Sequence, residues 1–409
     1  MQIRKIYNYS FLLIAAFPLL SLRWSTNLII IWGLLSVVQF FYDKIYKDLD
    51  RKDITSFFIL SLYYLLLLVS FLISGFDEEI LKFLETDAPF LVFPLLVIIN
   101  KKVIDKKTLN RSLLVFFVSN VILALKSWSQ ILNIGFAKLQ AENNFYQPVF
   151  RNLFFEETNI HLPYLGLLFV FSIGIGISWV LRGKLNFYIK LGIFLACALL
   201  LISIVTFSAR MSLFTFIIMS GYLLYKSIKG IKIKIIGILS LLLIAFFLIT
   251  QTPIKNRFDE VLKAKMELPN EKFNKKEHEV NFRYGIYYCA QPLLNKGFWW
   301  GIGKENIAKE LQACYDTFTF KGANDFQKVY YNTHNQYVDV LLSYGIFGFL
   351  LVITSLFFGL LKDPSTLYKL FLMIVGLALV TENLFDRQIG VVFYTFFNTL
   401  FYIKQTKQR

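Results

Sequence analysis

The chain has 409 residues, of which 56% are apolar, and it contains 44 Phe and 22 Tyr. Soluble domains have about 45–50% apolar residues and lack apolar runs long enough to cross a bilayer, so this composition excludes an ordinary soluble enzyme. The formal net charge is +16, but most Lys and Arg fall in short loops between apolar runs and form no basic stripe typical of nucleic-acid binding. The composition predicts an all-α polytopic membrane protein.

The apolar runs, taken in chain order, predict twelve transmembrane helices. The first run follows a short basic stretch and precedes no clear cleavage site, so we interpret it as an uncleaved helix. The fourth run is the least regular, because it contains Glu85, Asp87 and Pro89. The expected spans are 8–22, 26–42, 54–74, 79–99, 109–131, 160–181, 187–207, 210–227, 230–250, 335–361, 366–381 and 388–404.

The charges in the loops predict the orientation of this bundle. Four loops rich in Lys and Arg fall on one side of the expected topology, whereas the short loops between them are acidic or carry few cations. Excess Lys and Arg mark the cytoplasmic side, so both termini are expected to face the cytoplasm. The basic loops are 43–53, 101–107, 182–190 and 226–234.

One much longer polar loop is expected on the opposite side of the membrane. Loops longer than about 15 residues are usually functional or disordered, and this one has apolar residues at near-helical spacing in "RFDEVLKAKMEL" and "RYGIYYCAQPLL". We therefore expect it to form short helices over the bundle. A smaller outer loop is expected at about 132–159. The chain then divides into helices 1–9 (1–250), the large loop (251–334), and helices 10–12 with a cytoplasmic tail (335–409).

The chain has three cysteines, two of which lie in the large loop. An oxidising compartment would allow Cys289 and Cys314 to form a disulfide, but the sequence does not show whether their side chains meet. Cys197 lies within an expected span and is interpreted as a packing residue.

His334 is one of only three histidines and ends a polar stretch directly before the tenth expected span. The positive end of a helix dipole disfavours an imidazolium, so a neutral imidazole there is available to take a proton from a hydroxyl group. The alternative is a histidine that caps the helix or lies in the membrane interface. His334 is the candidate catalytic residue, and its neighbour Asn335 is a candidate substrate-binding residue.

Arginines at the outer boundary are candidates for binding a diphosphate, because the planar guanidinium matches phosphate oxygens. Arg210 lies between two expected spans, where a charge is costly unless it is paired; the alternative is an arginine that extends to the interface. Arg283 lies on an expected amphipathic helix, where a solvated charge is the alternative. Arg151 and Arg257 have weaker sequence context.

Glycines and charged patches complete the outer-face candidates. Gly297, Gly301 and Gly303 could cradle an anion through backbone N–H groups, although a plain turn also fits. Trp299 and Trp300 could anchor the loop in the interface. Two further patches either line a polar cavity with His334 or are ordinary solvated charges: Glu156, Glu157 and His161 in one, and Glu382, Asp386 and Arg387 in the other.

Several of these segments together resemble the O-antigen ligase and polymerase family (WaaL/Wzy-like). "HNQYVDVLLSYGIFGFLLVI" is similar to its HN-x-Y/F-x-x-x-L-x-x-x-G-x-x-G signature, and "TFSARMSLF" is similar to its S-R-G motif, with Ala209 preceding Arg210. "RYGIYYCAQPLLNKGFWWGIGKEN" resembles its R-x-x-x-W…P-x-x-G-x-G-x-x-N block, with Tyr287 in place of Trp. "HLPYLGL" and "ENLFDRQIGVVFYTFF" are loosely similar to other outer-face segments. The resemblance covers about residues 150–400.

The resemblance implies a bundle of about twelve helices with a large periplasmic loop, in a bacterial inner membrane. It implies transfer of a glycan from an undecaprenyl-diphosphate carrier to an acceptor hydroxyl at the periplasmic face, without metal or cofactor. His334 corresponds to the proposed general base, and Arg210 and Arg283 correspond to the arginines that bind the diphosphate. The expected partners are the carrier-linked donor, a glycolipid or glycan acceptor and the bilayer, with no nucleic acid. Arg151, His161, Asn335 and Glu382 are further candidates for substrate binding.

We expect a ligase acting on lipid A-core or a similar acceptor. A polymerase that uses another carrier-linked repeat as acceptor would share the same base and cations, and a protein O-oligosaccharyltransferase is a third variant. A polysaccharide transporter should instead carry polar groups near the membrane midplane and show repeated halves, whereas the polar groups here cluster at the outer boundary. A structural membrane scaffold is compatible with the composition.

Overall fold

The computed structural model describes residues 2–44, 49–134, 148–183, 185–227, 230–251, 282–319, 323–362 and 364–406. Within these residues, all regular secondary structure is helical. The stretch 257–268, which includes Arg257, lies outside the described residues, as does the part 135–147 of the expected outer loop at 132–159. The α-helices are α1 (Gln2–Ile14), α2 (Leu22–Tyr42), α3 (Arg51–Ile73), α4 (Glu78–Asp87), α5 (Pro89–Ile99), α6 (Lys106–Ile134), α8 (Pro148–Thr158), α9 (Leu162–Arg182), α10 (Phe187–Thr206), α11 (Arg210–Ser227), α12 (Ile231–Gln251), α14 (Phe282–Lys296), α15 (Lys304–Tyr315), α16 (Ala323–Val329), α17 (Gln336–Phe357), α18 (Thr366–Leu379) and α19 (Gln388–Thr406).

Six of the described helices are long and apolar enough to cross a membrane. The helical class and the multi-pass character expected from the sequence are thus confirmed, whereas the number of twelve spans stays a prediction. Helix α18 is apolar but shorter than the six. The six candidate spans are Leu22–Tyr42, Arg51–Ile73, Lys106–Ile134, Leu162–Leu181, Phe187–Thr206 and Gln336–Lys362.

Two of the expected spans are interrupted. The run at 79–99 forms α4 and α5, which meet at Ala88, because Pro89 has no N–H to continue the backbone hydrogen bonds and instead begins the second helix. The run at 335–361 forms α17, which is broken at Gly345 (φ 64°, ψ −171°), and then the 3₁₀ helix η3 (Phe358–Lys362). The first interruption places the buried carboxyl group of Asp87 at the end of α4, and the second lies where the backbone of residues 298–302 contacts α17.

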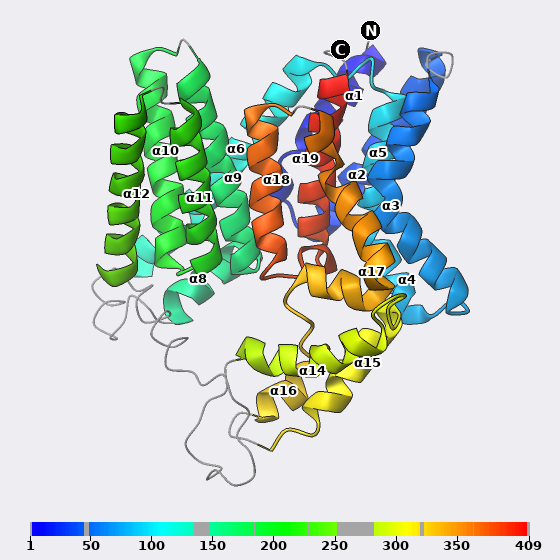
Figure 1. Ribbon diagram of the computed structural model, residues 1–409. Coiled ribbons are helices and arrows are strands. Elements are labelled where there is room, and N and C mark those ends of the chain that lie inside the picture. The colour runs from blue at the N-terminus through cyan, green and yellow to red at the C-terminus, as the bar shows by residue number, and fades with distance from the viewer. Residues whose placement is uncertain are drawn as a thin grey trace.

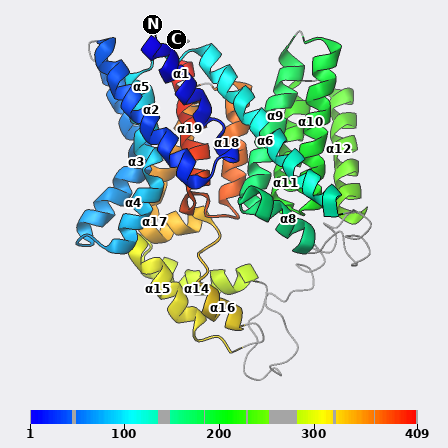
Figure 2. The same cartoon turned by 180° about the vertical axis from the view of Figure 1, so that it is seen from behind.

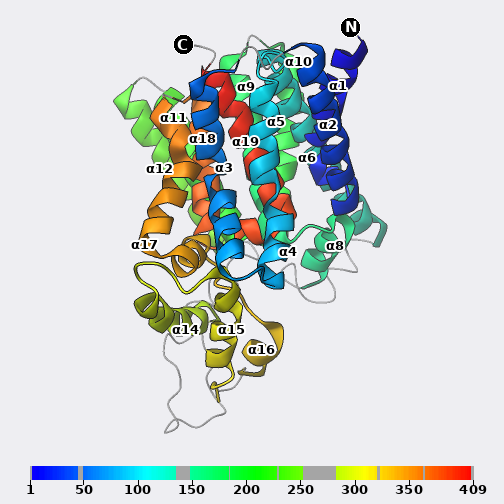
Figure 3. The same ribbon diagram turned by 90° about the vertical axis from the view of Figure 1, so that its right-hand side faces the viewer.

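Helix α19 lies at the centre of the bundle and is buried along most of its length (Figures 1 and 3). Apolar burial gives little driving force between helices inside a bilayer, so close packing of side chains must hold such helices together. Aromatic rings supply this packing around α19. Phe396 and Phe397 contact Phe11 of α1, Phe93 of α5, Phe116 of α6, Phe171 of α9 and Phe371 of α18.

The two ends of the bundle differ in character. Both termini, the start of α3 and the end of α5 lie at one end, where the basic loops between helices are found (Figures 1 and 2). Helices α14, α15 and α16, which we call the cap, lie beyond the opposite end (Figures 1 and 3). The arrangement agrees with the loop pattern in the sequence: the cationic loops share one end, and the helical part of the large loop covers the other.

The cap has its own small hydrophobic core. Ile286 and Ala290 of α14 pack with Leu311 of α15 and Phe326 of α16, and Leu342 of α17 joins them from the bundle. The described part of the expected large loop, 282–319 and 323–334, contains the three short helices of the cap. Because α17 contributes to this core, the cap is packed against the bundle.

Candidate active site

His334 lies in the non-helical segment 330–335, which connects α16 of the cap to α17. Its backbone is left-handed (φ 45°), and its N–H donates a 3.0 Å hydrogen bond to Oδ1 of Asn332. The following residue, Asn335, caps α17: its Oδ1 accepts from the N–H groups of Tyr337 at 3.0 Å and Val338 at 3.2 Å. His334 therefore stands one residue before the cap of the helix, as the sequence predicted, and its side chain is 25% exposed.

Glu382 connects His334 to Arg283. Its carboxylate oxygens lie 3.7 Å from Nδ1 of His334 and 3.8 Å from Nη2 of Arg283. Nη2 of Arg283 also donates a 2.9 Å hydrogen bond to the carbonyl of Thr381. Glu382, His334 and Arg283, which were predicted as site residues from separate parts of the sequence, thus lie close together. A carboxylate at Nδ1 stabilises the imidazolium that forms when the other ring nitrogen takes a proton.

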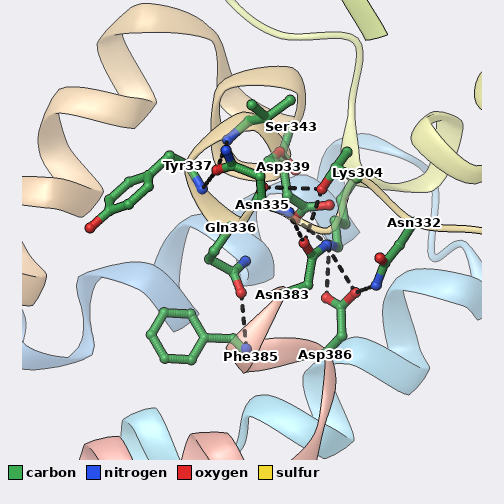
Figure 4. Close-up of polar contacts among 12 residues, drawn as sticks. Lys304, Asn332, Asn335, Gln336, Tyr337, Asp339, Ser343, Asn383, Phe385 and Asp386 are labelled. Atoms are coloured by element: carbon green, nitrogen blue, oxygen red, sulfur yellow. Dashed lines mark hydrogen bonds and ion pairs between the residues drawn. The ribbon is translucent and has the colours of Figure 1, made fainter. Parts of the chain in front are cut away.

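The segment 381–387, between α18 and α19, holds the His334 segment in position. Oδ1 of Asn383 accepts from the hydroxyl of Thr333 at 3.0 Å and from the N–H of Asn335 at 2.7 Å (Figure 4). The carbonyl of Asn383 in turn accepts a 2.8 Å hydrogen bond from the hydroxyl of Tyr164 on α9. Thr333 and Asn383 are both buried, so these hydrogen bonds are shielded from water and fix the backbone on both sides of His334.

A buried lysine connects the cap to the same segment. Lys304, the first residue of α15, is 6% exposed and places its Nζ 2.5 Å from Oδ2 of Asp339 on α17 and 3.4 Å from Oδ1 of Asp386 (Figure 4). Asp386 also accepts from Nδ2 of Asn332 at 2.7 Å and of Asn383 at 3.1 Å. Burial by itself lowers the pKa of Lys304, but the two carboxylates outweigh burial and raise it. The lysine therefore stays charged.

Asp87 belongs to the same buried region. It ends α4, is 1% exposed, and interacts electrostatically with Lys304, Asp386 and Asp339. Of the three carboxyl groups, those of Asp339 and Asp386 contact Lys304 directly. The ring of Phe83 lies 4.5 Å from Nζ of Lys304. The interruption between α4 and α5 therefore places a carboxyl group beside the residue that docks the cap.

His161 and two arginines extend the site toward α8 and α9. His161 is the N-terminal cap residue of α9, just outside the candidate span, and its ring interacts electrostatically with Glu382, Arg387, Arg151 and His334. Burial lowers the pKa of His161; Glu382 opposes this shift, whereas the two arginines add to it. The imidazole is therefore neutral near pH 7. His161, Arg151 and Glu382 were all expected from the sequence to line the site, and the structure brings them to the same end of the bundle as His334.

Arg210 begins α11, and a residue shortly before it in the chain is hydrogen-bonded to Arg151. Nη1 of Arg151 donates a 2.9 Å hydrogen bond to the carbonyl of Phe207, three residues before Arg210. Ser208 has a left-handed backbone (φ 54°) that turns the chain from α10 into α11. A Cβ at Gly166 of α9 would lie 2.1 Å from Oγ of Ser212, so α9 and α11 are in close contact here. The motif around Arg210 is thus packed against the helix that His161 caps.

Gly301 of the "GFWWGIG" stretch and Gly345 of α17 lie where the cap contacts the bundle. A Cβ at Gly301 (φ 81°) would lie 2.4 Å from the carbonyl oxygen of Ser343, and a Cβ at Gly345 (φ 64°) would lie 2.2 Å from that of Trp299. The N–H of Ile302 donates to the carbonyl of Leu342 at 2.7 Å, and that of Ile346 to Phe298 at 2.8 Å. Gly301 and Gly345 thus let the backbone of the cap contact the broken turn of α17 directly.

Cys289 of α14 and Cys314 of α15 form a disulfide, with their Cα atoms 5.8 Å apart. The sequence left this pairing open, since it contained no information on the distance between the two helices. Cys197 is the free cysteine and lies in α10. The disulfide joins the helix that carries Arg283 to the helix that begins with Lys304.

Three contributors to the site were missed from the sequence: Lys304, Asn383 and Asp339. One signal was available, because Asp339 is an acidic residue within an expected span and such a residue needs a partner. Lys304 and Asp386 are the partners that the fold provides. In the described part of the chain, no group of three or more His, Cys, Asp or Glu side chains is arranged to hold a metal ion.

Comparison with known proteins gives one family. The model of the Wzy_C family, described as O-antigen ligase, matches residues 164–353. The matched region begins in α9, includes the described part of the cap and His334, and ends in α17. No curated protein matches the chain.

Proposed function

Because residues 164–353 form an O-antigen ligase domain, we propose that the chain transfers a glycan from an undecaprenyl-diphosphate carrier to an acceptor hydroxyl. The contact that carries this proposal is that of His334 with Glu382, which also faces Arg283 and interacts with His161, the histidine beside Arg151 and Arg387. A base for the acceptor and cations for the leaving diphosphate are the two requirements of this reaction.

In the proposed reaction, the acceptor oxygen attacks the anomeric carbon of the carrier-linked sugar. The acceptor's proton goes to His334, the new glycosidic bond forms, and the bond between the anomeric carbon and the diphosphate oxygen breaks. Arg283 and Arg210 would stabilise the negative charge that develops on the diphosphate, with Arg151 and Arg387 as further cations. Glu382 would stabilise the imidazolium and hold Arg283 beside it, so the base and one of the cations are positioned by the same carboxylate.

We place this site at the periplasmic face of a bacterial inner membrane. Two features support the orientation: the basic loops gather at the opposite end of the bundle, and excess Lys and Arg mark the cytoplasmic side. The disulfide between Cys289 and Cys314 lies in the cap, and disulfides persist in oxidising compartments such as the periplasm. Labelling of single cysteines introduced into the loop 101–107 and into the cap, with a membrane-impermeant thiol reagent on intact cells, would test it. Labelling of the loop but not of the cap would reverse the orientation.

The identity of the acceptor distinguishes a ligase from a polymerase. We favour a ligase that uses lipid A-core or a similar glycolipid; a polymerase would use another carrier-linked repeat with the same base and cations. A deletion strain distinguishes the two, because loss of a ligase leaves long chains on the carrier, whereas loss of a polymerase leaves single repeats. Glycosylated proteins that disappear from the same strain would instead indicate a protein O-oligosaccharyltransferase.

Transfer by purified protein, with a defined carrier-linked donor and a candidate acceptor, tests the proposed base. His334→Asn is the sharpest variant, because Asn tolerates the left-handed backbone found here and lacks the basic nitrogen. We expect transfer to fall by about 10²–10⁴-fold, the usual contribution of a general base, while the protein still inserts. Transfer at the wild-type rate would remove His334 from this role.

The proposed cations are tested with the same assay. Arg210→Ala and Arg283→Ala should weaken use of the diphosphate carrier, whereas Arg111→Ala, an exposed arginine of α6, serves as a control for the loss of one positive charge. Unchanged kinetics toward the purified carrier in the first two variants would count against both assignments.

A further inference from the structure

A second candidate binding site lies at the end of the bundle opposite the cap. A pocket of about 510 Å³ is formed where the start of α3, the end of α5, η3 and the end of α19 meet. This is the end that carries the termini (Figure 1). The pocket is lined by five cationic side chains, two carboxylates, and polar and apolar groups, and none of these residues belongs to the His334 site. The lining residues are Asp50, Arg51, Lys52, Asp53, Thr55, Ser56, Ile59, Ile98, Lys101, Lys102, Phe358, Lys362, Tyr402 and Ile403.

The two carboxylates of the pocket are already engaged within the protein. Asp50 and Asp53 form a reciprocal cap at the start of α3, with each side chain accepting from the other's N–H at 2.8 and 3.0 Å. Asp53 also forms an ion pair with Lys101. The five cationic side chains of the lining outnumber its two carboxylates, so the pocket has an excess of positive charge that suits an anion.

Apolar side chains also line the pocket, and further exposed ones lie next to the lining residues in the chain. Ile59, Ile98 and Phe358 contribute apolar lining. Beside it, Ile54 and Phe58 of α3 are 55% and 53% exposed. Both α3 and the helix that ends in η3 are candidate membrane spans, so their exposed apolar side chains face lipid. On the η3 side, Leu360 and Leu361 are 45% and 71% exposed.

We propose that this pocket binds the phosphate-bearing headgroup of an anionic phospholipid in the leaflet opposite the catalytic face. Basic pockets between transmembrane helices bind such headgroups on the cytoplasmic side. The cations contact the phosphate, and the apolar flanks of α3 and η3 contact the acyl chains. A soluble phosphate compound would use only the first of these features. The inference is independent of the reaction at His334.

Native mass spectrometry of the purified, delipidated full-length protein, mixed with defined lipids, measures lipid binding and tests this proposal. The probes are phosphatidylglycerol, zwitterionic phosphatidylcholine and free glycerol 3-phosphate. The test variant carries Arg51→Gln, Lys52→Gln and Lys362→Gln. The matched control carries Lys190→Gln, Lys226→Gln and Lys232→Gln, which remove the same charge from exposed residues outside the pocket.

We expect the wild type and the control to prefer phosphatidylglycerol over phosphatidylcholine. The pocket variant should lose about fivefold in affinity for each cation removed, or roughly a hundredfold in all. Glycan transfer by the pocket variant should be unchanged with saturating donor. Equal binding of the two lipids, an equal loss in the control variant, or binding of glycerol 3-phosphate as tight as that of phosphatidylglycerol would each overturn the proposal.

Discussion

The carboxylate of Glu382 faces the imidazole of His334, with Oε2 3.7 Å from Nδ1. This distance is longer than a hydrogen bond, but the pair needs only to tighten when the imidazole takes a proton. The residues are 48 positions apart and meet because segment 381–387 is bonded to segment 332–335 through Asn383. We therefore regard Glu382 as a positioning residue for the proposed base.

Glu382→Gln should lower kcat for glycan transfer by less than the loss of the base itself, which is about 10²–10⁴-fold. The neutral amide can no longer stabilise the imidazolium or pair with Arg283. Glu382→Asp should recover part of kcat, because it restores the charge. Steady-state kinetics of both variants provide the measurement, with Glu310→Gln as the control, since Glu310 pairs with Lys296 on the exposed surface of the cap. A kcat for Glu382→Gln equal to that of the control would contradict the positioning role.

Lys304→Met should destabilise the docked cap by about 3–5 kcal/mol, because it leaves the buried Asp339 and the partly buried Asp386 without their cation. Adding Asp339→Asn should recover part of the loss, since one uncompensated charge is then removed. Thermal unfolding in detergent measures both changes. Lys296→Met, which breaks an exposed pair worth about 0–1 kcal/mol, is the control. Equal effects of Lys304→Met and Lys296→Met would show that the buried network does not hold the cap.

Gly345→Ala and Gly301→Ala should each destabilise the contact between the cap and α17. Both positions have a positive φ, which costs a residue with a Cβ about 1–2 kcal/mol, and both would bring a Cβ within 2.5 Å of a backbone oxygen. Gly192→Ala is the matched control: its Cβ would meet no atom within 4 Å, so inside α10 it should stabilise by about 0.5–1 kcal/mol. Limited proteolysis of the cap and thermal unfolding report the difference. Cap proteolysis in Gly345→Ala that matches the wild type would argue against direct backbone docking.

Replacement of both Cys289 and Cys314 by Ser should lower the stability of the cap by about 3 kcal/mol, given the 25-residue separation that the bridge spans. Cys197→Ala leaves the bridge intact and is the control. Gel mobility with and without reductant shows whether the bridge forms in cells. A protein that is fully reduced in cells with normal periplasmic oxidation would contradict both the bridge and the proposed location of the cap.

Acidification should destabilise the wild type more than His161→Gln. The folded pKa of His161 is lowered, chiefly by burial, so below its usual value of 6.5 the unfolded chain binds more protons than the folded one. Stability therefore falls as the pH decreases from 6.5 toward the folded pKa. Melting temperatures of the wild type and His161→Gln at pH 7.5, 6.5 and 5.5 measure this loss of stability. If the two melting temperatures change in parallel with pH, the lowered pKa assigned to His161 is excluded.

Much of the architecture follows from the sequence alone. Apolar runs and basic loops are local properties of the chain, so they identified the helical membrane class, the common end of the cationic loops and the helical cap. The polar stretch before α17 identified His334, and the order of motifs indicated the family that the comparison then found. The expected continuous run at 79–99 is interrupted at Pro89, a signal that the sequence contained.

Only the tertiary structure decided which of these groups meet. Glu382 lies beside both His334 and Arg283, Lys304 lies between Asp339 and Asp386, and Gly301 and Gly345 let the backbone of the cap contact α17. These contacts join residues that are 35 to 99 positions apart. Hydropathy and charge patterns repeat over one or two helical turns and therefore contain no information on such pairs. The pairs are set by how the helices pack and by the need of each buried charge for a partner.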